Sequence, residues 1–167
     1  MRDIPDWPSP GVLFKDITPL LRDPDAFGSA VDGLAAAGLA PNGEPTVDVV
    51  VGIEARGFIL ATPVAQRLGV GFVPVRKAGK LPAATEQVTY DLEYGTATVE
   101  MHADALSSGE RVLIVDDVLA TGGTIVASAH LVRTAGAHIA GVAVLMDLDL
   151  PDRHPGVDGV ELTALLK

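Results

Sequence analysis

Residues 112–124, with the sequence VLIVDDVLATGGT, constrain the fold more than any other stretch of the chain. Four apolar residues predict a buried strand, and the small residues of ATGGT predict a tight turn that opens a helix. In parallel α/β sheets, strand carboxyl ends and helix amino ends meet at one edge, where ligands bind. We therefore predict an α/β fold with a binding site around Asp116 and Asp117.

The rest of the chain alternates in the same way. Apolar residues at helical spacing predict helices at 24–38, 57–69 and 124–136, and β-branched or apolar runs predict strands at 46–53, 70–76, 111–117 and 138–147. Residues 1–22 are rich in Pro and Asp, which predicts an extended arm with a short strand and turn. Residues 76–86 predict an exposed, mobile loop, and 88–102 a β-hairpin. With 167 residues in all, we expect one domain with a largely parallel, twisted sheet flanked by helices.

The charge and the amino end bound the partners and the compartment. A formal net charge of −10 argues against binding to nucleic acid or an anionic membrane, since both need a basic face. The chain has no cysteine, which excludes a disulfide framework and thiolate metal sites. The start, MRDIPDWPSPG, lacks the apolar core of a signal peptide, and no apolar stretch reaches membrane-spanning length. We expect a cytoplasmic protein.

The turn after the predicted strand suits an anion. Thr121, Gly122, Gly123 and Thr124 can direct backbone N–H groups and two hydroxyls at one phosphate, helped by the helix dipole. The carboxylates of Asp116 and Asp117 are good acceptors for a pair of vicinal hydroxyls and, through water, suit Mg²⁺. Together they predict a ribose 5-phosphate ligand. Neither a Walker A loop nor a dinucleotide-binding GxGxxG occurs at this turn, and the acidic pair lies too late in the chain for a receiver domain.

The complete string, from Val112 to Thr124, closely resembles the phosphoribosyl pyrophosphate (PRPP) motif of the type I phosphoribosyltransferases. The segments PGVLFKDITPLL, GIEARGF, RKAGKLP and YDLEYG each resemble the adenine phosphoribosyltransferases of that family, and they extend the resemblance over almost the whole chain. The resemblance implies the type I phosphoribosyltransferase fold. Its β-hairpin, within residues 76–100, would be a flexible hood, and residues 1–22 a small base-binding segment.

Basic residues are less frequent than acidic residues in this chain. Arg76, Lys77 and Lys80, on the predicted loop, and Arg56, before a predicted helix, together favour binding of a pyrophosphate group. The resemblance implies that role for Arg56, Lys77 and Lys80. It also implies that Arg76 reaches across a homodimer to the neighbouring site. Glu54 and Ala55, directly before Arg56, are predicted to bind pyrophosphate with it, and the family suggests a strained peptide there, with the cis form as one option.

The remaining site residues rest on the resemblance alone. It implies that Phe14 stacks on the purine while the backbone of Leu13 and Lys15 reads its edge. It further implies that Glu93, beside Tyr94 in the hairpin, handles the adenine proton as general acid or base. Ala120 lies where relatives that use 6-oxopurines tend to carry an aspartate, so an apolar residue there favours adenine.

The predicted reaction converts PRPP and adenine into AMP and pyrophosphate, with Mg²⁺ held by the substrate and water and with no direct protein ligand. Glu93 and Arg56 are the predicted catalytic residues, and Ala120 to Thr124 anchor the 5′-phosphate. Two alternatives stay open: transfer to another base such as xanthine, and a non-catalytic regulator that senses PRPP or a purine. A regulator that binds nucleic acid should carry an added domain or a basic face, and the sequence shows neither.

Overall fold

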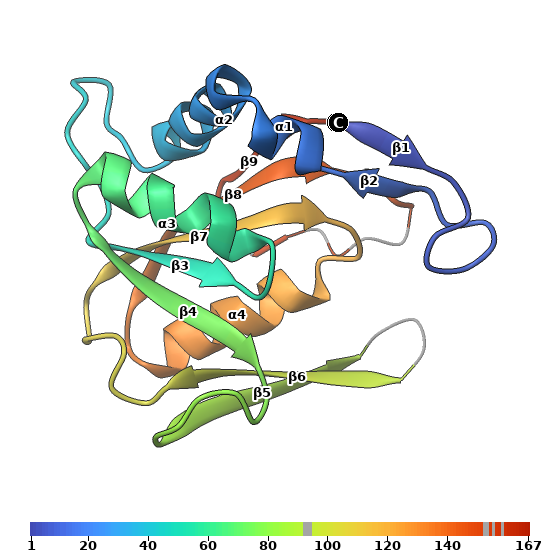
Figure 1. Cartoon of the computed structure of the whole chain (residues 1–167). Helices are drawn as coiled ribbons and strands as arrows, with labels where there is room; N and C mark the ends of the chain where they lie inside the picture. Colours follow the sequence, from blue (N-terminus) through green and yellow to red (C-terminus); the bar gives the residue numbers. More distant parts are fainter. Residues whose placement is uncertain (92–94, 152–153, 155, 158) are drawn as a thin grey trace.

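The computed structural model describes residues 1–91, 95–151, 154, 156–157 and 159–167. Its central element is a seven-stranded sheet of order β5-β6-β4-β3-β7-β8-β9 (Figure 1). The strands are β3 (Val49–Ile53), β4 (Gly71–Lys77), β5 (Thr85–Asp91), β6 (Thr96–His102), β7 (Arg111–Leu119), β8 (His138–Asp147) and β9 (Leu162–Leu166). Five of them, from β4 to β9 in the sheet order, run parallel, and β5 and β6 form an antiparallel hairpin on β4. The predicted α/β class and largely parallel sheet are confirmed.

Helices cover both faces of this sheet. Helices α2 (Pro24–Ala36) and α3 (Gly57–Leu68) lie on one face, and α4 (Gly123–Thr134) lies on the other (Figure 1). Strand β3 shows why the run of apolar residues is needed: Val50 packs with α2 and α3, whereas Val49 and Val51 pack with α4. A strand buried on both faces cannot alternate apolar with polar residues. Helix α2 begins as predicted, because the Asp23 carboxylate accepts hydrogen bonds from two backbone N–H groups of its first turn.

The amino-terminal segment is more structured than the predicted extended arm. Strands β1 (Arg2–Ile4) and β2 (Phe14–Asp16) pair in an antiparallel ribbon, and a short helix α1 (Thr18–Arg22) follows. Asp16 joins these pieces by accepting hydrogen bonds from Thr18 and from Arg2, and these bonds lower its pKa to about 2. The sequence predicted the strand at β2, but not its partner β1 or the helix.

Two further expectations need correction. Arg76 was expected where the strand ends and the loop begins, and Lys77 on the loop, but both are the last residues of β4 and pair with Glu100 and Val99 of β6, so the loop begins only at residue 78. The pairing with β6, which lies far along the chain, extends the strand past the point where its apolar character ends. Strand β9 was not expected at all; it pairs with β8 at the edge of the sheet.

Within the described residues, no helix is both long and apolar enough to cross a bilayer.

Candidate active site

Asp116 and Asp117 lie within β7, close to its carboxyl end, and both are buried. The Asp117 backbone N–H donates a hydrogen bond of 2.9 Å to Oδ1 of Asp116. Burial, and then the negative charge of Asp117, raise the pKa of Asp116 well above its ordinary value. Two adjacent buried carboxylates therefore resist carrying two full charges unless a cation or a hydrogen-bond donor reaches them.

The turn after β7 forms a small cavity. Gly122 has a φ of 85° and caps α4, whose first residues are Gly123 and Thr124. The cavity, of about 70 Å³, is lined by Asp116, Val118, Leu119, Ala120, Thr121, Gly122, Thr124 and Ile125. It lies at the amino end of a 12-residue helix, where free backbone N–H groups and the helix dipole favour an anion. Four of the residues predicted to bind phosphate, Ala120, Thr121, Gly122 and Thr124, thus line one cavity beside the aspartates, whereas Gly123 is not part of its lining.

Arg56 contacts two other predicted site residues, Asp117 and Phe14. It is the N-cap residue of α3, and its Nε lies 2.5 Å from Oδ2 of Asp117 in an ion pair. That contact lacks hydrogen-bond geometry, so Oδ2 is a buried acceptor without a hydrogen-bond donor among the described residues. The guanidinium also lies over the ring of Phe14, 5.0 Å from its centroid. Arg56 therefore occupies the space between the carboxylates and the proposed base-binding ring.

Gly57, the first residue of α3, allows this close approach of helix and strand. A Cβ at this position would lie 2.7 Å from Oδ1 of Asp116 and 3.2 Å from the carbonyl oxygen of Val115. A side chain there would have to displace its neighbours, so glycine is what lets the helix start that carries Arg56 lie this close to the aspartates.

The predicted pyrophosphate residues gather around Glu54. The Glu54 carboxylate receives Nζ of Lys80 at 2.7 Å, Nε of Arg76 at 3.2 Å and the backbone N–H of Lys77 at 3.0 Å. Burial alone would raise its pKa, but the bonds from Lys80 and Lys77 and the charge of Arg76 outweigh burial and lower it. The Glu54–Ala55 peptide is cis, which is the option that the family suggested. The Arg76 and Lys80 cations are thus held side by side by one carboxylate, which also accepts the backbone N–H of Lys77.

Glu100 supports the same loop from β6, and the sequence analysis did not single it out. It is buried, and its Oε1 accepts hydrogen bonds from the backbone N–H groups of Lys80 and Leu81 at 2.8 and 2.9 Å. Gln87 donates to the other oxygen at 3.0 Å. Burial raises the pKa of Glu100, but the backbone donors outweigh burial and lower it. An ionised carboxylate with this many donors holds the backbone around Lys80 in one conformation.

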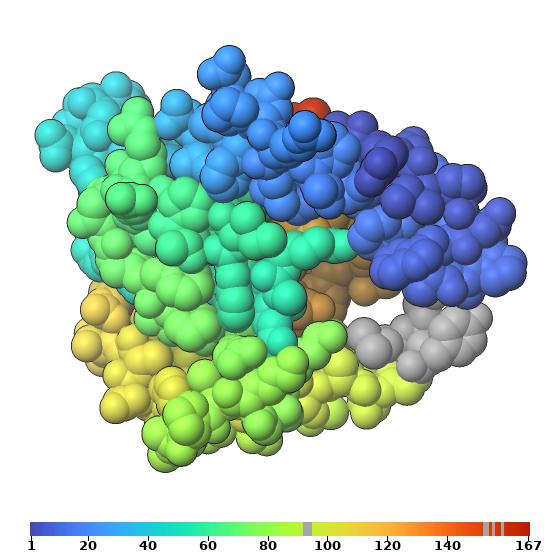
Figure 2. Space-filling view, in the orientation of Figure 1, coloured from blue at the N-terminus to red at the C-terminus, as the bar shows by residue number. Residues whose placement is uncertain are grey.

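The predicted base-binding residues stand opposite Arg56. Phe14 packs edge-on against Trp7, with 4.4 Å between ring centroids. The Phe14 ring therefore lies between the Trp7 ring on one side and Arg56 on the other. Leu13 is 50% exposed, and Nζ of Lys15 pairs with Asp3 at 2.9 Å. In the space-filling view the surface is hollowed between this amino-terminal segment and the β5–β6 hairpin (Figure 2).

The described part of the hairpin contacts this region through Tyr90. Tyr90, on β5, has its hydroxyl 2.8 Å from Oγ1 of Thr124. Glu93 and Tyr94, predicted to close over the reactants, lie outside the described residues. Their roles, like those of the other site residues, stay predictions.

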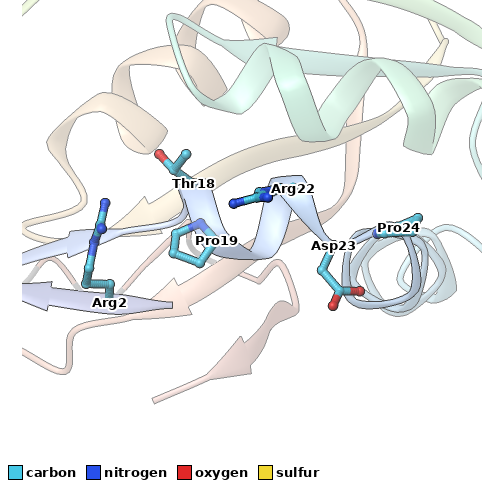
Figure 3. Close-up of a pocket in the computed structure, with 6 residues that line it drawn as sticks. All are labelled: Arg2, Thr18, Pro19, Arg22, Asp23 and Pro24. Atoms are coloured by element: carbon cyan, nitrogen blue, oxygen red, sulfur yellow. The ribbon is translucent and has the colours of Figure 1, made fainter.

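A larger cavity, of about 580 Å³, lies elsewhere and contains none of the predicted site residues. Figure 3 shows its lining, which comes from β1, α1 and the start of α2: Arg2, Thr18, Pro19, Arg22, Asp23 and Pro24. Arg2 is engaged with Asp16 and the Asp23 carboxylate caps α2. The larger volume of this cavity therefore does not make it a better candidate for the active site.

Sequence reasoning missed Gly57, Tyr90 and Glu100, although signals for two of them were present. Gly57 directly follows Arg56 at a predicted helix start, and Tyr90 belongs to the YDLEYG segment. Nothing in the sequence marks Glu100, because a glutamate in a hairpin strand usually faces solvent.

The fold and this site point to one class of enzyme, the phosphoribosyl transferases, and the model of the phosphoribosyl transferase domain matches residues 21–156. The chain is 59% identical over 165 residues to the adenine phosphoribosyltransferase of Thermobifida fusca, covering 99% of this chain and 92% of the relative. The chain therefore belongs to the adenine phosphoribosyltransferases of this family.

Solved structures agree with this placement. The adenine phosphoribosyltransferase of Thermoanaerobacter pseudethanolicus superposes with a TM-score of 0.90 at 48% identity, with 99% of this chain and 94% of that chain covered. The Saccharomyces cerevisiae enzyme, solved with a dideoxy-imino-altritol bisphosphate and adenine, gives a TM-score of 0.87 at 39% identity, with 97% and 92% covered. The family predicted from the PRPP motif is confirmed.

Proposed function

We propose that this chain transfers the 5-phosphoribosyl group of PRPP to adenine and releases AMP and pyrophosphate. The observation that carries the proposal is the arrangement at the end of β7. Two buried carboxylates lie directly beside an anion-sized cavity at a helix amino end, and a cation enters from the facing helix. Such a site accepts a diol, a phosphate and a pyrophosphate of one ligand. Close relatives named as adenine phosphoribosyltransferases support the choice of base.

In the proposed reaction, N9 of adenine forms a bond to ribose C1 while the bond from C1 to the pyrophosphate oxygen breaks, and that oxygen keeps the electron pair. Positive charge develops on the ribose, so the negative potential of Asp116 and Asp117 stabilises the transition state. Arg56, Lys77 and Lys80 stabilise the charge on the departing pyrophosphate. Glu93 takes the proton that adenine loses at N9, and closure of the hairpin keeps water from PRPP.

Arg56 must change partners in this scheme. In the structure its guanidinium pairs with Asp117 and covers the ring of Phe14. The ribose diol would supply Asp117 with new hydrogen bonds, and the pyrophosphate would draw the guanidinium away. The ring of Phe14 is then free to stack on the purine. Binding of PRPP thereby prepares the base site.

Mg²⁺ and the homodimer are part of the proposal. Among the described residues, no three acidic or histidine side chains converge on a metal position. We propose a cation that takes most of its ligands from pyrophosphate oxygens and water, and Mg²⁺ held in this way would neutralise charge on the leaving group. Arg76 would have to release Glu54 to reach a second subunit. We place the enzyme in the cytoplasm.

The test measures pyrophosphate release from PRPP and Mg²⁺ with adenine, hypoxanthine, guanine and xanthine in parallel. Two variants accompany the parent chain: Glu93→Ala, and Glu86→Ala as the control, since Glu86 is an exposed glutamate on β5. We expect turnover with adenine alone, much reduced by Glu93→Ala and unchanged by Glu86→Ala.

Each other result has a definite meaning. Turnover with xanthine or a 6-oxopurine in preference to adenine would contradict the choice of base. Binding of PRPP without turnover on any base would contradict the enzyme and favour a PRPP-sensing regulator. Equal activity of the two glutamate variants would remove Glu93 from the mechanism.

A further inference from the structure

Tyr90 is a candidate for a role in substrate binding that neither the motif nor the family likeness assigns. It lies on β5, at the end of the hairpin strand that leads toward residues 92–94. Its ring packs against Gly123, where a Cβ would lie 3.0 Å from Cδ2 of the ring. Its hydroxyl lies 2.8 Å from Oγ1 of Thr124, and either atom can be the donor.

The chemistry of a phosphate ligand decides the direction of that hydrogen bond. A hydroxyl has one proton to donate and can accept two hydrogen bonds. Thr124 lines the proposed phosphate cavity, and a phosphate dianion offers only acceptors, so the Thr124 hydroxyl must donate to it. The same oxygen can then engage Tyr90 only by accepting the phenol proton. Bonds arranged in such a chain polarise and strengthen one another.

We infer that Tyr90 is a positioning residue for PRPP: it donates to Thr124 and so directs the Thr124 proton toward the 5′-phosphate. This inference rests on the proposed function of the cavity. Tyr90 need not touch the substrate, and its effect is confined to ligands that carry the 5′-phosphate. Because Tyr90 belongs to the hairpin, the same bond also ties the hairpin to the phosphate end of the site.

The experiment compares binding of ribose 5-phosphate and of pyrophosphate with Mg²⁺ by calorimetry, so it needs no turnover. Tyr90→Phe keeps the ring that packs on Gly123 and removes only the hydroxyl. The control is Thr89→Val, which removes the 2.9 Å hydroxyl pair of Thr89 and Thr98 on the exposed side of the same hairpin. Losing one charge-assisted donor chain should weaken ribose 5-phosphate binding by about 3- to 10-fold. Pyrophosphate binding should change by less than twofold, and Thr89→Val should change neither.

A double-mutant cycle separates positioning from a structural effect. If Tyr90 acts through Thr124, Tyr90→Phe should cause no further loss in a Thr124→Val background, and Thr124→Ser should restore the dependence on Tyr90. In turnover assays, Tyr90→Phe should raise KM for PRPP while kcat stays within twofold. An equal loss for both ligands, or additive losses in the cycle, would overturn the inference. Absent turnover in the parent chain would count against the proposed function alone.

A second measurement avoids any substitution of Tyr90. The chain has two tyrosines, so fluorotyrosine labelling gives two ¹⁹F signals, which a Tyr94→Phe sample assigns. The Tyr90 signal should shift on addition of ribose 5-phosphate and stay in place on addition of pyrophosphate. A signal that ignores ribose 5-phosphate while that ligand binds would contradict the hydrogen-bond chain.

Discussion

Substitution of Gly57 tests whether the close contact between α3 and β7 is what builds the site. Gly57→Ala adds one methyl group at the first residue of a helix, and its backbone does not need the left-handed region, so the conformation suits alanine. The added carbon would lie 2.7 Å from Oδ1 of Asp116, about 0.7 Å short of the 3.4 Å at which ordinary contact begins. The carbonyl oxygen of Val115, at 3.2 Å, closes a second side. Helix and strand must therefore move apart.

The expected loss of stability in Gly57→Ala follows from two opposing contributions. Overpacking of this kind costs about 1–3 kcal/mol, and alanine returns at most about 1 kcal/mol of helix propensity, less at a helix start. We expect a net loss of about 1–2 kcal/mol, which for a chain of this size lowers Tm by roughly 2–8 °C. The displaced parts are the N-cap Arg56 and the Asp116 carboxylate, so PRPP affinity should fall by about tenfold, the equivalent of 1.4 kcal/mol.

Gly28→Ala is the matched control. Gly28 lies in the middle of α2, and a Cβ there would meet no atom within 4 Å. Alanine at this position should stabilise the protein by up to about 1 kcal/mol and leave PRPP kinetics unchanged. Thermal unfolding and KM for PRPP decide the matter. If Gly57→Ala proves as stable as Gly28→Ala and keeps the parent KM, the contact is not tight and the reasoning fails.

Three further predictions concern charge and metal. Because burial and Asp117 raise the pKa of Asp116 well above 3.8, the protonated form is favoured on folding. The contribution of Asp116 to the free energy of unfolding is therefore fully present below pH 3.8 and is lost as pH rises through the pKa of Asp116 in the folded protein. Asp116→Asn should therefore raise Tm at pH 8, and this gain should vanish in acid. The same variant should bind ribose 5-phosphate about 10- to 100-fold more weakly, because a charged acceptor is lost. A Tm that falls at pH 8 would contradict the argument that the buried charge is destabilising. Asp48 is the opposite case, since hydrogen bonds from Arg111 lower its pKa to about 2. Urea unfolding of Asp48→Asn should show a loss of stability at pH 7 that disappears as pH falls from about 4 to about 2, and a loss independent of pH would refute this ion pair as the cause. Finally, EDTA should abolish turnover reversibly and leave Tm unchanged, because the cation is held by substrate; a lower Tm in EDTA would show a metal bound by the protein itself.

Local patterns in the sequence determined most of the secondary structure. The predicted 138–147 strand coincides with β8, and the capping aspartate, proline and apolar spacing located the start of α2. Such features depend on residues a few positions apart, so the sequence carries them directly. The position of 112–124 at a strand end and helix start follows from the same local reasoning, and with it the identification of the family.

Long-range pairing decided what the local pattern missed. Arg76 and Lys77 extend β4 only because β6 pairs with them, and β9 forms only because β8 offers an edge. Strand pairing joins segments far apart in the chain, and a short, mostly apolar stretch such as LTALL of β9 does not reveal its partner.

The site was decided at both levels. The residue types in the PRPP motif were enough to predict which kind of ligand binds at the end of β7. Only the tertiary structure brought Arg56 from α3 against Asp117 and Phe14, set Gly57 against Asp116, and laid Tyr90 of the hairpin on Thr124. Side chains that meet in a site come from elements whose mutual position depends on the packing of the whole core, and no local sequence pattern encodes that packing.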